Sequence, residues 1–346
     1  MSVFTDGLNP QQLAAVKHSG SPLLVVAGAG SGKTRVLTRR VAYLLAERNV
    51  APYEVLAITI TKKAAGEMKE RVTHLVGDRA KMMWVSTFHS ACVRILRREA
   101  ALLGYTNSFT IYDQSDSLRL VTLVMRDLNL DAKRYAPRAV AALISQAKNE
   151  LLGPADYLNQ SKDHFQEIVA QVFAIYQKRL SAANSMDFDD LIAKSVEVMQ
   201  RFPECRAKYR SRFKHILVDE YQDTNHAQYV LIKELVGSEQ EGFPPAELCV
   251  VGDADQSIYA FRGANIRNIL QFEADYLNAK TILLEQNYRS TQNILNAANS
   301  VIANNEGRKE KNLWSEAGAG ELITGYVAES EHDEADFVVQ QIRKLQ

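Results

Sequence analysis

The sequence predicts an α/β protein built on a parallel sheet, with a helical domain inserted into it. Apolar runs typical of buried strands alternate with stretches of helical periodicity between Leu23 and Leu96, which is the pattern of a doubly wound sheet. From about Asp116 to Phe202 the periodicity is almost wholly helical, and a strand pattern returns only at His215. Successive strands of a compact α/β unit rarely lie more than about 30 residues apart. We therefore expect an all-helical insertion.

The expected elements follow from the spacing of the apolar residues. Short uninterrupted apolar runs indicate buried strands, and apolar residues three or four positions apart indicate amphipathic helices. In chain order we expect a helix over 11–17, a strand over 23–26, a helix over 33–47, a strand over 55–60, a helix over 63–75, a strand over 84–86 and a helix that carries Cys92. After the insertion we expect strands over 215–219, 248–252 and 281–284, a helix over 293–304, a strand over 322–327 and a helix over 335–345.

Composition excludes some classes of function. Lys and Arg number 41, as do Asp and Glu, so the 346-residue chain has no net charge and any polyanion site must be a local patch. Cys92, Cys205 and Cys249 lack the paired spacing of a zinc site, and we interpret them as buried or incidental thiols in a reducing compartment. The N-terminus lacks a secretory signal, and no apolar run approaches the ~18–20 residues that span a membrane. We expect a cytoplasmic protein of two or three domains.

A glycine-rich turn joins the first expected strand to the following helix. It reads Ala27-Gly28-Ala29-Gly30-Ser31-Gly32-Lys33-Thr34, and this context is that of the phosphate loop of nucleoside triphosphatases. Glycines let several backbone N–H groups converge on one anion, and the helix dipole adds to that cradle. Lys33 supplies a charge for the β- and γ-phosphates, and Thr34 supplies a hydroxyl for Mg²⁺. Ala27 replaces the usual first glycine with little added bulk.

Carboxylate and amide residues follow two later strands. Asp219 and Glu220 end the strand that begins at His215, and Gln256 follows the strand over 248–252. Ligands of a parallel sheet bind beyond the carboxyl ends of its strands, where the phosphate loop also lies. We expect Asp219 to hold Mg²⁺, Glu220 to orient the attacking water, and Gln256 to bridge the γ-phosphate to a group beyond it.

Two aromatic residues stand close behind Gln256. Tyr259 and Phe261 are two positions apart, beside Arg262. Aromatic faces stack on unpaired bases without sequence preference, at about 1–3 kcal/mol per base. The same spacing fits two core residues on one face of a strand. These residues alone therefore favour the core interpretation, and base stacking needs further context.

Seven short blocks occur in order along the chain. They are LNPQQ at 8–12, AGAGSGKT at 27–34, TFHS at 87–90, DFDDL at 187–191, VDEYQDT at 218–224, GDADQSIY at 252–259 and LEQNYRS at 284–290. The series resembles the motif set of the UvrD-like (UvrD, PcrA and Rep) superfamily 1 DNA helicases. The resemblance covers essentially the whole chain, and the last three blocks are specific in combination.

The resemblance implies a RecA-like P-loop NTPase core that uses ATP and Mg²⁺. It implies a first RecA-like domain over 1–90 and 211–281, an all-helical insertion over 91–210, and the incomplete start of a second RecA-like domain over 282–346. ATP would bind between the two RecA-like domains and drive 3′→5′ movement along single-stranded DNA. The implied partners are single-stranded DNA, its junctions with duplex DNA, and DNA-repair proteins, near the nucleoid.

The resemblance also implies roles in nucleotide binding for individual residues. Gln12 would read the adenine, while Arg35 and Tyr288 would sandwich it. Arg289 resembles the arginine finger that the second domain offers to the γ-phosphate, which ties closure of the cleft to charge that develops in the transition state.

The DNA contacts depart from the family pattern at several positions. The resemblance assigns the single-strand path to His89, Phe188, Tyr259 and Phe261, with Arg262 beside them. Phe261 stands where a tryptophan is common, so stacking would persist with a smaller ring. Ile60 and Lys62 stand where the family usually has Phe and Asn. Ile60 cannot stack on a base, so we leave it out of the site.

The family's later motifs have no counterpart before Gln346. We expect the N-terminal part of a longer helicase, able to bind Mg-ATP and single-stranded DNA but a poor unwinding enzyme by itself. Residues beyond about 282 would be stabilised by unusual packing or by association with another copy. Two alternatives stay open: the helicase part of a RecB-like helicase–nuclease, and a non-catalytic, ATP-gated module that binds single-stranded DNA.

Overall fold

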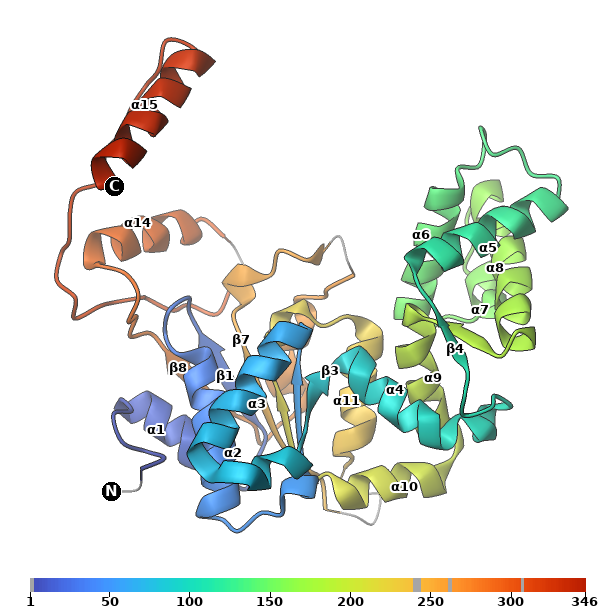
Figure 1. Cartoon of the computed structure of the whole chain (residues 1–346), viewed down its shortest axis with the longest axis horizontal. Helices are drawn as coiled ribbons and strands as arrows, with labels where there is room; N and C mark the ends of the chain where they lie inside the picture. Colours follow the sequence, from blue (N-terminus) through green and yellow to red (C-terminus); the bar gives the residue numbers. More distant parts are fainter. Residues whose placement is uncertain (1–2, 239–243, 261–262, 306–307) are drawn as a thin grey trace.

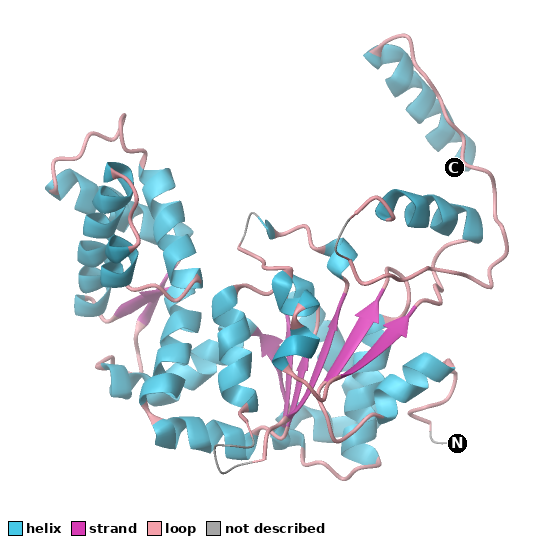
Figure 2. Ribbon diagram, turned by 180° about the vertical axis from the view of Figure 1, so that it is seen from behind, coloured by secondary structure: helices cyan, strands magenta, loops and turns pink. Residues whose placement is uncertain are grey.

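The centre of the molecule is a six-stranded parallel sheet with helices on both faces (Figures 1 and 2). The computed structural model describes residues 3–238, 244–260, 263–305 and 308–346. The strand order is β3-β2-β6-β7-β1-β8, and every neighbouring pair is parallel. The strands are β1 (Leu23–Ala27), β2 (Val55–Thr59), β3 (Trp84–Thr87), β6 (His215–Val218), β7 (Glu247–Gly252) and β8 (Lys280–Leu284).

The two faces of the sheet bury different side chains. Successive residues of a strand point to opposite faces, so Leu23 and Val25 join one core while Leu24 and Val26 join the other. The first core is closed by α1 (Pro10–Lys17), α2 (Lys33–Ala46) and α3 (Lys62–Val76). The second is closed by α4 (Phe88–Glu99), α9 (Phe188–Arg201), α10 (Pro203–Arg212) and α11 (His226–Val236). The structure thus has the doubly wound sheet that the sequence predicts.

The insertion forms a lobe with its own apolar core, seen at the upper right of Figure 1. It is built from α5 (Gln114–Asp127), α6 (Pro137–Asn149), α7 (Pro154–Asn159) and α8 (His164–Ala182). The prediction of an all-helical insertion is wrong in one respect, because β4 (Thr110–Tyr112) and β5 (Ser185–Asp187) pair as a small parallel sheet. Strands of three residues are too short to produce a readable alternation.

The predicted domain bounds divide continuous elements. The bounds of the insertion, 91–210, fall inside α4 and α10, and both helices pack on the central sheet together with α9. The predicted start of the second domain at 282 falls inside β8, which pairs with β1 in the first sheet. The division into domains at these residues stays a prediction.

Beyond β8 the chain leaves the central sheet. It forms α14 (Gln292–Ile302) and α15 (Glu331–Leu345), and α15 projects away from the body in Figure 1. The prediction of a strand over 322–327 is wrong: these residues have no regular structure, and Leu322 and Val327 are 85% and 95% exposed. Apolar residues alone do not make a strand, because a strand also needs a hydrogen-bonded neighbour.

The remaining elements are short. They are α12 (Arg267–Leu270), α13 (Phe272–Asp275) and 3₁₀ helices over Pro52–Glu54, Gly77–Met82, Ala100–Leu103, Tyr221–Asp223 and Ala254–Gln256. Within the described part of the chain, no helix combines the length and the apolar character that a bilayer crossing requires.

The three cysteines are free and buried, as the sequence predicts for thiols that pack in a core. Burial raises the pKa of the Cys92 thiol to about 12 and that of Cys205 to about 11. Because the thiolate is the reactive form, both side chains are chemically inert at neutral pH.

A cluster of charged side chains lies at the end of the sheet opposite the phosphate loop. Glu247, the first residue of β7, accepts bonds of 2.7 and 2.9 Å from Arg48, and His215 Nδ1 lies 3.4 Å from its carboxylate. Burial acts to raise the pKa of the Glu247 carboxyl, but the contacts with His215 and Arg48 outweigh it and hold this pKa well below its usual range. The ionised carboxylate therefore stabilises the fold.

Replacing Glu247 with Gln is expected to lower the free energy of unfolding at pH 7 by about 1–3 kcal/mol, the range for a hydrogen bond to a charged group. Because the pKa of Glu247 is lowered in the folded state, its carboxylate adds stability when the pH is above its pKa in the unfolded chain, about 4.3. That stability is lost as the pH falls towards the folded-state pKa. Urea denaturation between pH 7 and pH 3 should therefore show that the difference in unfolding free energy between wild type and Glu247→Gln narrows below about pH 4. Glu67→Gln, at an exposed carboxylate of α3, is the control. A gap that does not depend on pH contradicts this account.

Candidate functional site

The candidate site lies at the carboxyl ends of three strands. The phosphate loop follows β1, Asp219 and Glu220 follow β6, and Gln256 comes shortly after β7. β7 lies between β1 and β6 in the sheet, so side chains from the two outer strands must reach across its end to meet. They do meet, at Lys33.

Lys33, the first residue of α2, makes the central contact. Its Nζ donates a 2.8 Å hydrogen bond to Glu220 Oε2 and a longer one, 3.5 Å, to Gln256 Oε1. Glu220 has a φ of +50°, in the left-handed region that non-glycine residues rarely adopt. Such backbone strain is found mostly at functional sites, where the surrounding structure maintains it.

Two glycines give the phosphate loop its shape. Gly30 and Gly32 have φ values of +70° and +90°. A Cβ at residue 30 would lie 2.6 Å from Asn287 Nδ2, and one at residue 32 would lie 2.9 Å from Gln12 Nε2, so a side chain at either position would be strained by its φ and would displace a neighbouring amide. Gly32 caps α2 without a side-chain bond, which leaves the first N–H groups of this helix for a ligand. This cradle fits a phosphate group.

Asp219 and Thr34 carry oxygen atoms of the kind that a magnesium ion prefers, and they follow β6 and β1. Asp219 is buried, and its Oδ1 accepts a 3.0 Å bond from the Glu220 N–H. Burial, and next the nearby Glu220 carboxylate, raise the pKa of Asp219 to about 6, while Lys33 opposes the rise. A divalent cation beside Asp219 would favour its ionised form. The oxygen atoms of Asp219 and Thr34 are thus of the kind that can hold Mg²⁺.

Gln222 is a site residue that the sequence reasoning missed. It is buried, its Nε2 donates to Glu220 Oε2 at 2.9 Å, and its Oε1 accepts from the Asp253 N–H at 2.9 Å. It thereby joins the segment after β6 to the segment after β7 and holds the Glu220 carboxylate. The available signal was its place inside the VDEYQDT block.

Gln12 lies on the other side of the phosphate loop. Its Nε2 donates to the Ser31 carbonyl at 3.0 Å, and its Oε1 accepts from the Asn9 N–H at 3.2 Å. An amide has two donors and two lone pairs, and these two contacts hold the buried Gln12 side chain against the loop. Arg35 donates to the Gly7 carbonyl at 2.8 Å, and the Tyr288 hydroxyl accepts from Asn9 Nδ2 at 2.9 Å. The structure thus brings Gln12, Arg35 and Tyr288 to the same side of the loop.

The segment around Arg289 rests on the phosphate loop. The Tyr288 N–H donates to the Gly30 carbonyl at 2.9 Å, and Asn287 Nδ2 donates to the Ala29 carbonyl at 2.6 Å. Arg289 Cβ lies 2.8 Å from the position of a Cβ built at Gly30, while the residue itself is exposed. Asn287 was missed by the sequence reasoning, although it lies within the LEQNYRS block.

Two of the predicted DNA-binding residues lie together. His89 and Phe188 pack edge to face, with ring centroids 5.9 Å apart, and Phe188 is 48% exposed. Burial lowers the pKa of His89, which keeps its ring neutral. Tyr259 is half-buried and follows β7, whereas Phe261 and Arg262 lie outside the described residues. Ile60, which we left out of the site, packs against the core.

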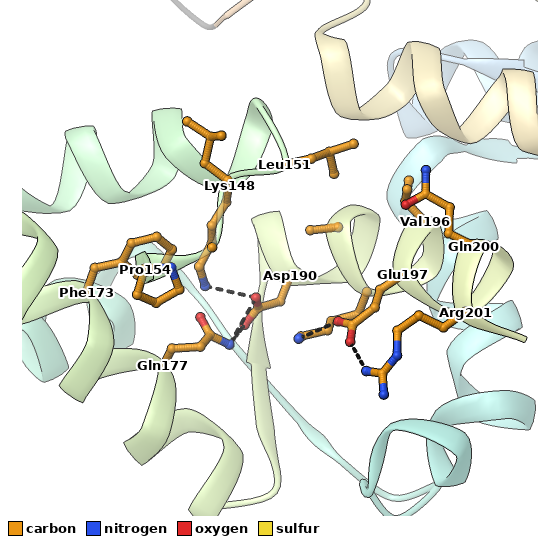
Figure 3. A pocket seen from close by; sticks show the side chains of 14 residues that line it. Lys148, Leu151, Pro154, Phe173, Gln177, Asp190, Val196, Glu197, Gln200 and Arg201 are labelled. Carbon is orange, nitrogen blue, oxygen red and sulfur yellow. Dashed lines mark hydrogen bonds and ion pairs between the residues drawn. The ribbon is translucent and has the colours of Figure 1, made fainter. Parts of the chain in front are cut away.

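A buried ion cluster supports the helix that begins with Phe188. Lys148 donates to Asp187 at 2.7 Å and pairs with Asp190 at 3.0 Å, and Tyr176 donates to Asp187 at 2.7 Å. Figure 3 shows Lys148 and Asp190 at the wall of a cavity of about 290 Å³ between α6, α8 and α9. The cavity belongs to the insertion and not to the phosphate loop. No local signal marks Lys148 as buried, so sequence reasoning missed it.

Two family models match the chain in succession. One is described as the UvrD/REP helicase N-terminal domain and matches residues 8–277, and the other is described as the UvrD-like helicase C-terminal domain and matches residues 282–346. Together they cover the central sheet, the insertion and the segment beyond β8.

Similar proteins of bacteria carry helicase names. The chain is 64% identical over 345 residues to "ATP-dependent DNA helicase UvrD1" of Mycobacterium tuberculosis, a match that covers 98% of this chain and 45% of that protein. It is 60% identical to the protein of the same name in Mycobacterium leprae, with the same coverage. It is 52% identical to "ATP-dependent DNA helicase PcrA" of Staphylococcus aureus, covering all of this chain and 47% of that protein. The chain therefore spans about half the length of the curated relatives it matches.

Proposed function

The chain belongs to the UvrD/REP helicase family, and from this premise we propose that it is the nucleotide-binding part of an ATP-dependent DNA helicase. The proposed activity is hydrolysis of Mg-ATP coupled to 3′→5′ movement along single-stranded DNA, in DNA repair or replication. The observation that carries the proposal is the meeting of Lys33, Glu220 and Gln256 at the phosphate loop.

Each residue of this group has a definite task in ATP hydrolysis. Lys33 and the loop N–H groups bind and orient the phosphates. Glu220 accepts a proton from the attacking water or orients it, and Gln222 holds the carboxylate for that purpose. Thr34 and Asp219 would hold Mg²⁺, which supplies charge neutralisation at the phosphates when bound. Arg289, against the loop, would stabilise charge on the γ-phosphate.

The proposed path of single-stranded DNA runs over His89 and Phe188. The exposed ring of Phe188 offers a face on which a base can stack without sequence preference. The neutral His89 ring holds it edge-on. Tyr259 and Phe261 would extend the path, with Arg262 near the DNA backbone.

The whole helicase is proposed to need more than this chain. The relatives are about twice as long, so we propose that the chain binds ATP and single-stranded DNA and unwinds duplex poorly alone. DNA junctions and repair proteins are its proposed partners, at the nucleoid in the cytoplasm. In the full-length protein, faster unwinding of duplex with a 3′ tail than with a 5′ tail checks the direction.

The non-catalytic alternative keeps one argument in its favour. A chain that spans half of its relatives could bind ATP and DNA without turnover. Hydrolysis stimulated by single-stranded DNA in the full-length protein separates the two proposals. A nuclease domain in the remainder of the full-length protein would identify the RecB-like helicase–nuclease.

Lys33→Ala is expected to abolish measurable Mg-ATP binding by the chain and to lower DNA-stimulated turnover of the full-length protein by about 100-fold or more, the effect of removing one donor from a charge-stabilising site. Isothermal titration calorimetry and a phosphate-release assay measure the two effects. Lys17→Ala, at an exposed lysine of α1, is the control and should behave as wild type. Turnover that survives Lys33→Ala rules out the proposed site.

Phe188→Ala is expected to weaken binding of oligo(dT) by roughly 5- to 100-fold, the loss of one base stacked on an aromatic ring. Phe188→Tyr should keep most of the affinity, and the salt dependence should not change because no cation is removed. Fluorescence anisotropy at several salt concentrations measures both properties. Leu158→Ala is the matched control, since this residue of the insertion is also about half exposed, at 49%. An unchanged affinity for Phe188→Ala places the DNA elsewhere.

The chain is also proposed to self-associate through its C-terminal segment. Val339, Ile342 and Leu345 of α15 are 44%, 51% and 89% exposed, and exposed apolar surface of this kind favours association. Light scattering after size exclusion should show a mass that rises with concentration. Ile342→Glu should reduce that rise, whereas Glu334→Gln on the same helix should not. A constant monomer mass at all concentrations contradicts the proposal.

A further inference from the structure

A short segment after α14 lies against the phosphate loop, and we call residues 308–315 the strap. Leu313 approaches Gly28 so closely that a Cβ at residue 28 would lie 2.4 Å from Leu313 Cδ2. The Trp314 N–H donates to the Glu285 carbonyl at 3.1 Å, and the Trp314 carbonyl accepts from the Asn287 N–H at 2.8 Å. The strap therefore covers one side of the loop, and its backbone is tied to the segment that follows β8.

Two cations of the strap are held by two carboxylates that follow β7. Lys311 Nζ donates to Asp253 and to Asp255, and Arg308 donates to Asp255 through Nε at 3.0 Å and Nη2 at 2.7 Å. The Lys311 and Asp253 side chains are only 5% and 2% exposed. Charges so far from water are retained only when they are paired. Each member of this cluster therefore fixes the position of the others.

The same cluster contacts Gln256, the residue expected to bridge the γ-phosphate to a group beyond it. Gln256 Nε2 donates to the Asp253 carboxylate, which turns the amide oxygen of Gln256 towards Lys33, 3.5 Å away. The two ends of a glutamine amide differ in hydrogen bonding and hardly in shape, so their neighbours decide the orientation. An unbroken series of polar contacts thus runs from Lys33 through Gln256 and Asp253 to Lys311.

We propose that Lys311 is a positioning residue of the nucleotide site, which fixes the Gln256 amide through Asp253 and keeps the strap on the phosphate loop. An anion in the loop competes with Glu220 and Gln256 for Lys33, so it changes the contacts at one end of this series. The strap lies at the other end of this series of polar contacts. Linkage between two sites is reciprocal. If a bound nucleotide changes how the strap is held, the loss of Lys311 must change the affinity for that nucleotide. This inference rests on the proposed ATP-binding function.

A purely structural role for the cluster leads to a different expectation. In that case the loss of Lys311 lowers the stability of the chain but leaves the nucleotide affinity of the folded chain unchanged. The test must therefore follow the strap and the nucleotide separately.

Trp314 gives the strap an optical signal of its own. The chain contains two tryptophans, of which Trp84 is buried and Trp314 is 43% exposed. The emission of a Trp314→Phe variant comes from Trp84 alone. Subtracting it from the emission of the protein that keeps both tryptophans leaves the emission of Trp314. Acrylamide quenching of that difference, in the nucleotide-free chain, measures how open the strap is. Mg-ATP affinity is measured on the same proteins by calorimetry.

Lys311→Met is expected to raise the quenching constant of Trp314 about two-fold or more and to weaken Mg-ATP binding by roughly 5- to 50-fold, within the usual range of coupling between sites. Lys311→Arg keeps the charge and should recover most of both properties. Lys309→Met is the matched control, because this neighbouring lysine of the strap pairs with Glu273 at 2.9 Å, away from Asp253. It should leave both properties at their wild-type values.

Lys311→Met leaves Asp253 buried without its cation, which costs stability. The double variant Asp253→Asn/Lys311→Met removes that charge as well, and it should fold and show the same open strap and weak binding. The inference is overturned if either variant folds and its Mg-ATP affinity stays within about two-fold of wild type, the error of independent sites, or if the quenching constant of Trp314 keeps its wild-type value.

The proposed function fails in a distinguishable way. A wild-type chain that does not bind Mg-ATP, or a Lys33→Ala variant that binds it equally well, contradicts the function and with it the link to the nucleotide. The quenching of Trp314 in Lys311→Met then still decides whether Lys311 holds the strap.

Discussion

The rest of the site depends on the hydrogen bond from Lys33 to Glu220. The two residues are 187 positions apart in the chain and follow β1 and β6, which are not neighbours in the sheet. Their contact exists because all six strands run in one direction, so the loops after β1, β6 and β7 open at the same edge of the sheet. Without an anion in the loop, Glu220 neutralises Lys33. The pair keeps a positive charge in a half-buried position, and in the proposed function a phosphate replaces the carboxylate.

Much of the central domain could be predicted because its signals are local. The phosphate loop is a contiguous sequence with one backbone shape, and the strands buried on both faces are short apolar runs. The meeting of Lys33 with Glu220 and Gln256 also followed, since the ends of parallel strands share an edge. By contrast, the roles assigned to Gln12, Arg35 and Arg289 came from family resemblance. The structure brings these residues to the loop without testing what they do.

The rest could not be predicted because it depends on partners that are distant in the chain. β4 and β5 form only when they pair with each other, and the apolar residues over 322–327 find no neighbouring strand. Lys148 and Lys311 have ordinary lysine surroundings in the sequence, yet both are buried by carboxylates from other segments. Burial of a charge is a property of the completed fold, and no periodicity of the chain reports it.

β8 attaches the C-terminal segment to the sheet directly beside the strand that leads into the phosphate loop. The Gly28 N–H donates to the Leu284 carbonyl, where this segment begins, while α15 stands farthest from the body (Figure 1). Leu284 is therefore the last residue of this segment that the sheet itself holds. The contacts of Asn287 and Tyr288 with the phosphate loop lie close to this attachment, and α15 lies far from it. A displacement of this segment relative to the sheet would thus move α15 farther than it moves the residues beside the phosphate loop.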